Sequence, residues 1–212
     1  MQRMIIVGAG GLGREVEAFA RHDYANGKDW YIGGFLDTRP EVLSAFATQV
    51  GVIGDPTTFV PQKDDIFIVA VGDTRLKKRL VASMRLRGAR FVSLRTHVQI
   101  SPRATYGASV FGDRATVSVD AIVGDYAYIG ADTILGHDVV VGDYAHIGAR
   151  CFVAGRVHIG EGAVIHPMAS IATDVRIGEW ATVGLGAVVF NEVPPGTTVV
   201  GNPARRLPRT QD

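Results

Sequence analysis

Bulky apolar residues recur at every sixth position of this chain, without interruption, from Phe111 to Val189. A helix would repeat its apolar positions about every 3.6 residues and a half-buried strand every second residue, so neither explains the pattern. A period of six is instead typical of a hexapeptide β-helix, in which short strands wind into stacked coils. The positions between the two ends are Val117, Val123, Ile129, Leu135, Val141, Ile147, Val153, Ile159, Ile165, Ile171, Ile177 and Val183.

The residues that flank each apolar position fit a triangular coil. Glycine directly follows the apolar residue in most repeats, where we expect it to permit a tight corner. Three hexads make one coil, with the large side chain inside and the backbone paired to the next coil. Small residues recur at the fourth position after the large one, and Cys151 in such a position is expected to lie inside.

Residues 1–95 follow a different pattern, in which strand-like and helix-like segments alternate. This alternation predicts a parallel sheet. Asp73 is expected to cap the second helix, which Gly88 ends. The expected strands are Met4–Val7, Tyr31–Leu36, Ile66–Val71 and Phe91–Leu94, and the expected helices are Arg14–Arg21 and Thr74–Leu86.

These patterns divide the chain into three parts. Residues 1–95 are predicted to form an α/β domain, half of a Rossmann fold, and residues 96–190 a parallel β-helix. Residues 191–212 leave the sixfold pattern and contain Pro194 and Pro195, so we expect a cap or tail at the open end of the stack.

A glycine-rich turn follows the first expected strand. Gly8, Gly10 and Gly13 form a G-x-G-x-x-G pattern between a strand and a helix, the context in which this pattern binds a nucleotide. Free N–H groups and the helix dipole favour a phosphate there, and Asp37 could accept a ribose hydroxyl, as in NAD sites. However, about 95 residues provide only one mononucleotide-binding half, so a single nucleoside diphosphate fits better. A turn kept only for packing is the alternative.

Composition excludes several classes of function. Lys and Arg number 22 against 21 Asp and Glu, so no strong field favours nucleic acid or an anionic membrane. One cysteine excludes a disulfide framework and a Cys-based zinc site. The sequence shows no signal-peptide segment and no apolar stretch of membrane-spanning length, and a cytoplasmic location fits.

Several short motifs accompany the repeat. Together with the hexads, their order resembles the left-handed β-helix sugar acetyltransferases, in the branch that holds the sialic-acid O-acetyltransferase-like and bacillosamine-pathway nucleotide-sugar N-acetyltransferases. The resemblance covers nearly the whole chain and implies a left-handed coil, although the usual crossover rule predicts the opposite hand. The motifs are GAGGLG at Gly8–Gly13, FLD at Phe35–Asp37, VGD at Val71–Asp73, SP at Ser101–Pro102, HD at His137–Asp138 and GNPAR at Gly201–Arg205.

The resemblance implies acetyl transfer from acetyl-CoA to a nucleotide sugar. Such transfer needs a base near neutral pH, a task that suits histidine. His137 is the only histidine of the repeat that an acid follows, so it takes the family's role of base, with Asp138 raising its basicity. Adjacent strand residues point to opposite faces, so this contact requires a bend in the chain. No two histidines have the spacing of a β-helix carbonic anhydrase, and no metal is expected.

The coil length places further candidates. Gly155 lies three hexads after His137, one coil above it, where its N–H could face the acetyl oxygen. His146 lies half a coil after His137, so the two histidines can share a site only across a subunit boundary. Family members are homotrimers with acetyl-CoA between neighbouring β-helices, which implies that His146 and Leu185 contact the coenzyme.

The resemblance also implies that the first domain holds the nucleotide-sugar acceptor. Many relatives have His where Leu12 stands and a second acid where Thr38 stands, so the acceptor sugar stays open. N-acetylation of a nucleotide-linked amino sugar is the first hypothesis; O-acetylation of a sialic-acid-like sugar and a non-catalytic nucleotide-sugar-binding β-helix are the alternatives. The implied acceptor contacts are Gly10, Gly11, Leu12, Asp37, Thr38 and Gly72.

Overall fold

The computed structural model describes residues 1–208, which form two compact units. The first unit spans Met1–Thr96 and the second begins at His97. Of the predicted cap or tail, residues 209–212 lie outside the described part of the chain. No helix within residues 1–208 is long and apolar enough to cross a membrane.

The first unit contains a parallel sheet with the strand order β3-β2-β1-β4. A parallel bridge between Phe67 and Phe91 continues the sheet past β4. β4 is buried along its whole length, as the continuous apolar run predicts for a strand covered on both faces. The elements are β1 (Gln2–Val7), α1 (Gly11–Arg21), β2 (Trp30–Leu36), β3 (Val52–Gly54), β4 (Asp65–Val69), α2 (Thr74–Leu86) and β5 (Leu94–Arg95).

The predicted order of strands and helices is confirmed, with differences at α1, at β3 and at the predicted strand Phe91–Leu94. That last segment forms only an isolated bridge at Phe91 and the two-residue strand β5. Asp73 caps α2 as predicted, because its carboxylate accepts the N–H groups of Arg75 and Leu76, each at 2.9 Å. The prediction that the first helix starts at Arg14 is wrong, because the second half of the glycine-rich turn already forms its first turn. β3 was not predicted, since it is too short to show a pattern.

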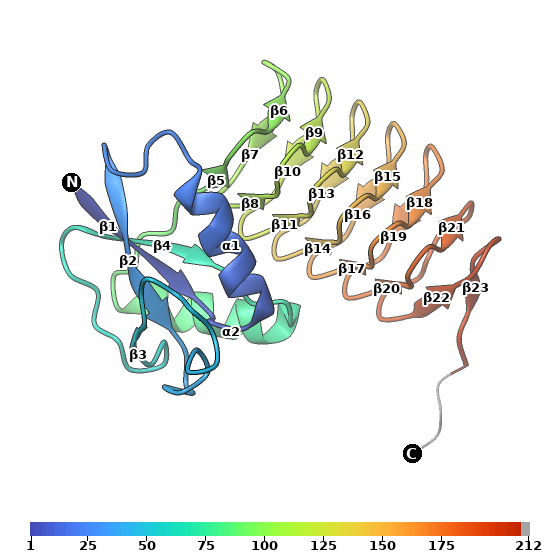
Figure 1. The fold of residues 1–212 in the computed structure, drawn as a ribbon. Coiled ribbons are helices and arrows are strands. Elements are labelled where there is room, and N and C mark those ends of the chain that lie inside the picture. The colour runs from blue at the N-terminus through green and yellow to red at the C-terminus, as the bar shows by residue number, and fades with distance from the viewer. Residues whose placement is uncertain (209–212) are drawn as a thin grey trace. The chain divides into compact units, whose positions relative to one another are not determined.

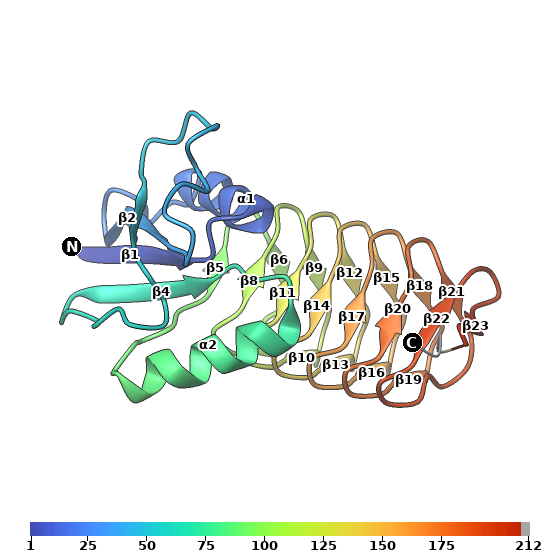
Figure 2. The same ribbon diagram turned by 90° about the horizontal axis from the view of Figure 1, so that it is seen from below.

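The chain reverses its direction across the sheet between β1 and β4. From β1 it passes through α1 to β2, and from β4 it passes through α2 to the bridge at Phe91, on the other side. Right-handed crossovers in opposite directions place the two helices on opposite faces, as Figure 2 shows. In open parallel sheets, ligands bind at such a switch point, outside the carboxyl ends of the strands.

The second unit is a left-handed parallel β-helix, as predicted, and its coils follow one another in Figure 1. From β8 to β21 the second residue of every strand is buried, and these residues are the sixfold apolar series. Cys151 is also buried, as predicted.

The strands of this unit form three sheets. The first contains β6 (Gln99–Ile100), β9 (Thr116–Val117), β12 (Ile134–Leu135), β15 (Phe152–Val153), β18 (Ser170–Ile171) and β21 (Val188–Val189). The second contains β7 (Thr105–Tyr106), β10 (Ile122–Val123), β13 (Val140–Val141), β16 (His158–Ile159) and β19 (Arg176–Ile177). The third includes β8 (Val110–Phe111), β11 (Tyr128–Ile129), β14 (His146–Ile147), β17 (Val164–Ile165), β20 (Thr182–Val183), β22 (Thr198–Val200) and β23 (Arg205–Arg206).

The glycines of the repeat do not act at the corners as predicted. The corner residues with positive φ are mostly not glycine; examples are Tyr126 at 60° and Asp138 at 59°. The glycines are needed instead because successive coils approach closely. A Cβ on Gly130, for example, would lie 2.4 Å from the backbone nitrogen of Ala149. Close backbone contact between coils, rather than backbone freedom, therefore explains the glycine that follows the bulky residue in most repeats.

The coil length changes at both ends of the stack. In the middle, paired strands are separated by three full hexads, as between Tyr128 and His146. Gln99 pairs with Thr116, which shortens the first coil by one residue. Thr182 pairs with Thr198, which shortens the last coil by two. The sixfold series therefore stops at Val189 although the stack continues through β22, and among residues 1–208 only β23 turns back antiparallel.

A pair of neighbouring residues tests the inward and outward positions. Ile177→Ala should lower the free energy of unfolding by about 2–5 kcal/mol, because the side chain is buried in the core and leaves a cavity. Arg176→Ala, at the exposed position of the same strand, should change it by no more than about 0.5 kcal/mol. Urea unfolding followed by circular dichroism measures both, and equal losses would contradict the assignment of the two faces.

Candidate functional site

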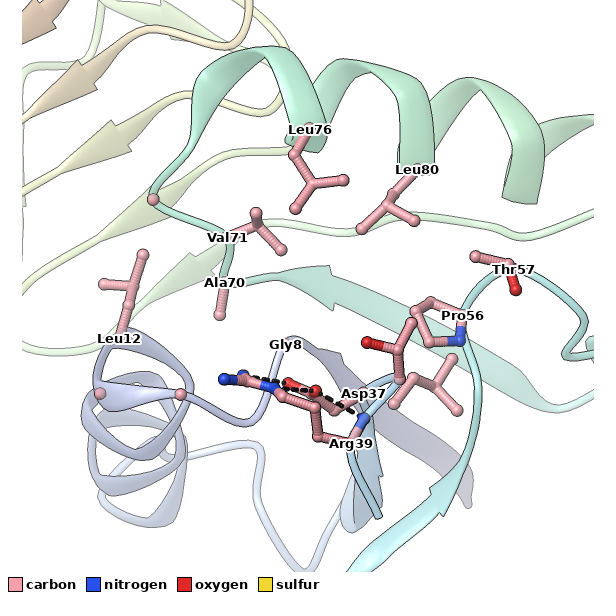
Figure 3. A pocket seen from close by; sticks show the side chains of 15 residues that line it. Gly8, Leu12, Asp37, Arg39, Pro56, Thr57, Ala70, Val71, Leu76 and Leu80 are labelled. Atoms are coloured by element: carbon pink, nitrogen blue, oxygen red, sulfur yellow. Dashed lines mark hydrogen bonds and ion pairs between the residues drawn. The ribbon is translucent and has the colours of Figure 1, made fainter. Parts of the chain in front are cut away.

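A cleft with a volume of about 500 Å³ lies at the switch point of the first unit, between the ends of β1, β2 and β4 and the first turns of α2 (Figure 3). A cleft of this size can hold a small ligand. All six residues that were predicted to contact the acceptor line it. The structure therefore brings together residues that lie as far apart in the sequence as Gly10 and Gly72.

The glycines around this cleft have two different roles. A Cβ on Gly13 would lie 2.0 Å from the carbonyl oxygen of Gly8, and a Cβ on Gly8 would lie 2.6 Å from the carbonyl oxygen that follows β4. These two glycines permit close packing. A Cβ on Gly10, Gly11 or Gly72 would meet no atom within 4 Å, so these three keep the cleft open. Packing and access to a ligand thus both account for the glycines.

The start of α1 forms an electropositive part of the cleft. Its N-cap residue is Gly10, which has no side chain that could accept the first N–H groups of the helix, and the first turn carries no acidic residue. The first N–H groups of a helix have no acceptor within the helix, and the helix dipole is positive at this end. The arrangement favours an anionic ligand group.

Asp37 joins the end of β2 to the glycine-rich turn. The carboxylate is buried and accepts the Ala9 N–H at 3.0 Å and the Arg39 guanidinium at 2.9 and 3.1 Å. Burial by itself raises the pKa of the Asp37 carboxyl, but the hydrogen bonds from Arg39 and Ala9 outweigh burial and hold the pKa below its ordinary value. Asp37 is therefore ionised at neutral pH.

The remaining walls of the cleft were not predicted from the sequence. Leu76 and Leu80 point into it from α2, and Pro56 and Thr57 come from the loop after β3 (Figure 3). Arg87 holds this loop, because its guanidinium donates to the Pro56 carbonyl oxygen at 2.6 Å. The spacing of two leucines one helical turn apart after a helix cap could have indicated one wall; the loop depends on β3, which carries no pattern.

In the second unit, His137 and Asp138 form the corner between β12 and β13. The positive φ of Asp138 supplies the bend that contact between these neighbours requires. His137 Nδ1 lies 2.7 Å from Asp138 Oδ2, and the two side chains are 50% and 53% exposed. When Nδ1–H donates to the carboxylate, Nε2 keeps its lone pair and can accept a proton.

Arginines on the same corner of other coils pair with other carboxylates, so Asp138 remains available to His137. Arg156, one coil above, donates to Asp174 at 2.7 and 2.9 Å. Arg103, two coils below, donates to Asp120 at 2.7 Å through two nitrogens. Both arginines that could compete for Asp138 are therefore engaged by other carboxylates.

Gly155 lies one coil above His137, as the spacing predicts. A Cβ on Gly155 would lie 2.4 Å from Nε2 and 2.5 Å from Cε1 of His137, so the imidazole ring lies against the glycine backbone. The Arg156 N–H donates to the His137 carbonyl oxygen at 2.9 Å and holds the two coils in register. A side chain at residue 155 would displace the ring.

The other two predicted coenzyme contacts lie elsewhere on the coil. His146 is in β14, where its ring stacks on Tyr128 of the coil below, with centroids 4.8 Å apart and an angle of 17°. Leu185 is 71% exposed at the corner that follows β20. Within one chain, neither residue shares the corner of His137.

Metal and thiol chemistry find no support in the described residues. No group of three or more His, Cys, Asp or Glu within residues 1–208 is arranged to hold a metal ion. Burial raises the pKa of the Cys151 thiol, so the thiolate needed for a nucleophile is disfavoured.

The matches to protein families fall on either side of the boundary between the two units. Residues 3–84 match the PglD N-terminal domain, and residues 120–155 and 156–191 match the bacterial transferase hexapeptide repeats. No curated protein matches the sequence.

Two solved structures with bound coenzyme are similar over nearly the whole chain. PerB from Caulobacter crescentus, in complex with CoA and GDP-perosamine, is 27% identical over 98% of both chains, with a TM-score of 0.85. The acetyltransferase domain of PglB from Neisseria gonorrhoeae, in complex with acetyl coenzyme A, is 26% identical, and the match covers 97% of this chain and 99% of that chain with a TM-score of 0.88.

Two alanine substitutions separate the roles of the cleft glycines. Gly13→Ala should destabilise the first unit by about 1–3 kcal/mol, because the added Cβ overlaps a carbonyl oxygen. Gly72→Ala is the matched control, since its Cβ meets nothing within 4 Å. Thermal unfolding should show a lower midpoint for the first variant only, whereas equal midpoints would mean that the turn relaxes around Gly13.

Proposed function

We propose that this chain, whose two parts match the PglD N-terminal domain and the bacterial transferase hexapeptide repeats, transfers the acetyl group of acetyl-CoA to the amine of a nucleotide-linked amino sugar. The observation that carries the proposal is the His137–Asp138 pair, with its free basic nitrogen against Gly155. The similar PerB and PglB structures hold CoA with GDP-perosamine and acetyl coenzyme A, respectively, which supports both substrate classes.

His137 is the general base in this mechanism. Asp138 holds Nδ1–H, so Nε2 accepts a proton from the sugar amine as its nitrogen attacks the thioester carbonyl carbon. The C–N bond forms and the C–S bond breaks, and the proton passes from Nε2 to the departing sulfur, which leaves as the CoA thiol. The carboxylate of Asp138 stabilises the imidazolium that forms between the two transfers.

Gly155 supports the developing negative charge. Because it has no side chain, the thioester can approach its backbone beside His137 Nε2. The Gly155 N–H then donates to the carbonyl oxygen as it becomes an oxyanion. The same glycine leaves space for the base and supplies a donor.

The cleft of the first unit is assigned to the nucleotide part of the acceptor. It lies at the switch point of a half-Rossmann sheet, where the start of α1 favours a phosphate. Gly10, Gly11 and Gly72 leave backbone exposed to the ligand. Its volume of about 500 Å³ suits one nucleotide better than a dinucleotide.

A homotrimer with sites between subunits completes the proposal. His137 and His146 lie on different parts of the coil, so one chain alone does not bring them together. Apolar side chains on the two sheets that meet at the His137 corner are exposed: Ile122 by 50%, Ile134 by 45% and Phe152 by 50%. Such a surface suits contact with a second copy of the chain.

Substitution of the base tests the mechanism. His137→Ala should lower the turnover number by about 10²–10⁴, the contribution of a general base. His22→Ala, which changes an exposed histidine at the end of α1, is the control and should retain activity. The assay follows release of free thiol from acetyl-CoA with UDP-, GDP- and dTDP-linked amino sugars. Unchanged turnover in His137→Ala would remove histidine from the role of base.

Mixing two inactive variants tests the shared site. If His137 of one subunit works with His146 of the next, His137→Ala and His146→Ala chains refolded together in equal amounts should regain about one quarter of the wild-type activity, because random trimers leave one interface in four intact. Each variant refolded alone is the control. No recovery, with trimers confirmed by light scattering, would place both histidines in the site of one chain, whereas full activity of His146→Ala refolded alone would remove His146 from the site.

A further inference from the structure

The carboxylate of Asp37 has no acceptor position left for a ligand. Its Oδ1 accepts the Arg39 backbone N–H at 3.0 Å and Arg39 Nε at 2.9 Å. Its Oδ2 accepts the Ala9 N–H at 3.0 Å and Arg39 Nη2 at 3.1 Å. A carboxylate offers about four acceptor positions, and these four bonds occupy them. The prediction that Asp37 itself contacts the acceptor therefore requires Arg39 to leave first.

Arg39 keeps donors available after it has paired with Asp37. The pair uses Nε and one N–H of Nη2, and a guanidinium has five N–H groups. The two terminal nitrogens thus still present a parallel fork of N–H donors, the geometry that binds a phosphate through two oxygens. The Arg39 side chain is 65% exposed and lines the cleft. In Figure 3 the guanidinium extends past Asp37 toward the helix that carries Leu12.

The charge balance of the cleft also depends on Arg39. Among the described residues that line the cleft, Asp37 and Arg39 are the charged ones. Without Arg39, the ionised Asp37 would repel an anionic ligand across a largely apolar space. With Arg39 in place, its positive charge balances the negative charge of the carboxylate. The electrostatic potential in the cleft is then positive because of the start of α1.

We propose that Arg39 binds the diphosphate of the acceptor, together with the N–H groups at the start of α1, and that Asp37 is a positioning residue that fixes the guanidinium and the glycine-rich turn. This inference rests on the proposed function and deepens it, since it makes a nucleoside diphosphate the unit that the cleft recognises. Neutral amino sugars and nucleosides without phosphate gain nothing from Arg39.

Calorimetric titration of the full chain with UDP, GDP and dTDP tests the proposal without acetyl transfer. Arg39→Ala should weaken binding of the preferred diphosphate by about 10- to 100-fold, the effect of losing charge-assisted hydrogen bonds. Arg39→Lys keeps the charge but not the fork and should fall between this variant and the wild type. Binding of the corresponding nucleoside, measured by NMR titration, should change less than about twofold, because its contacts lie outside the phosphate site.

The double variant Asp37→Asn/Arg39→Ala separates repulsion from lost contact. It should bind the diphosphate more tightly than Arg39→Ala by about threefold or more, because the uncompensated carboxylate is gone. The matched control is Arg114→Ala, which breaks a similar side-on pair with Asp132, at 2.8 and 2.9 Å, in the second unit. Diphosphate binding should not change in this control. Circular dichroism should show that all variants remain folded.

Each result supports or overturns a different statement. Equal diphosphate binding by wild type and Arg39→Ala would overturn the role of Arg39 and leave the acceptor class intact. If Arg39→Ala weakens binding of the nucleoside as much as binding of the diphosphate, Arg39 contacts the nucleoside part of the ligand, and the proposed diphosphate contact is overturned. If none of the three diphosphates binds the wild type, the acceptor class itself is wrong, and the inference fails with it.

Discussion

In the middle of the β-helix, each short strand forms backbone hydrogen bonds with the strand three hexads away, as between Tyr128 and His146. This pairing decides where every side chain of the second unit lies. It brings the Gly155 backbone against the His137 ring, and it holds Asp138 in a left-handed backbone conformation that an isolated residue would rarely adopt. The geometry of the proposed base is therefore a consequence of coil stacking rather than of local preference.

Much of this could be predicted from the sequence, because a period of six has one structural explanation. The inward residues, the position of Gly155 above His137 and the cap at Asp73 all follow from spacing. The role of the repeat glycines was misjudged because spacing cannot distinguish a corner from a close approach of two backbones. The ends of the stack were missed because their coils are shorter than three hexads and leave the sixfold series.

The first unit was harder to predict, for a physical reason. Its cleft is lined by loops and helix faces that are far apart in the sequence and come together only in the folded unit. Pro56 follows a very short strand, and Leu80 points into the cleft only because of how α2 packs. The sequence placed Asp37 correctly but not its four hydrogen bonds. Motif residues could be located, whereas the side chains that complete the cleft depend on tertiary packing.

The change of coil length at the two ends has an evolutionary consequence. An extra residue between His137 and Gly155 would separate the imidazole from the glycine backbone and turn the following side chains from inside to outside. The same change in a terminal coil affects only the edge of the stack. Insertions and deletions should therefore accumulate at the ends during divergence, while outward-facing residues of the middle coils that lie outside the proposed site and subunit contacts can change more freely. In such a protein the count of residues between two positions is under stronger selection than most of the residues counted.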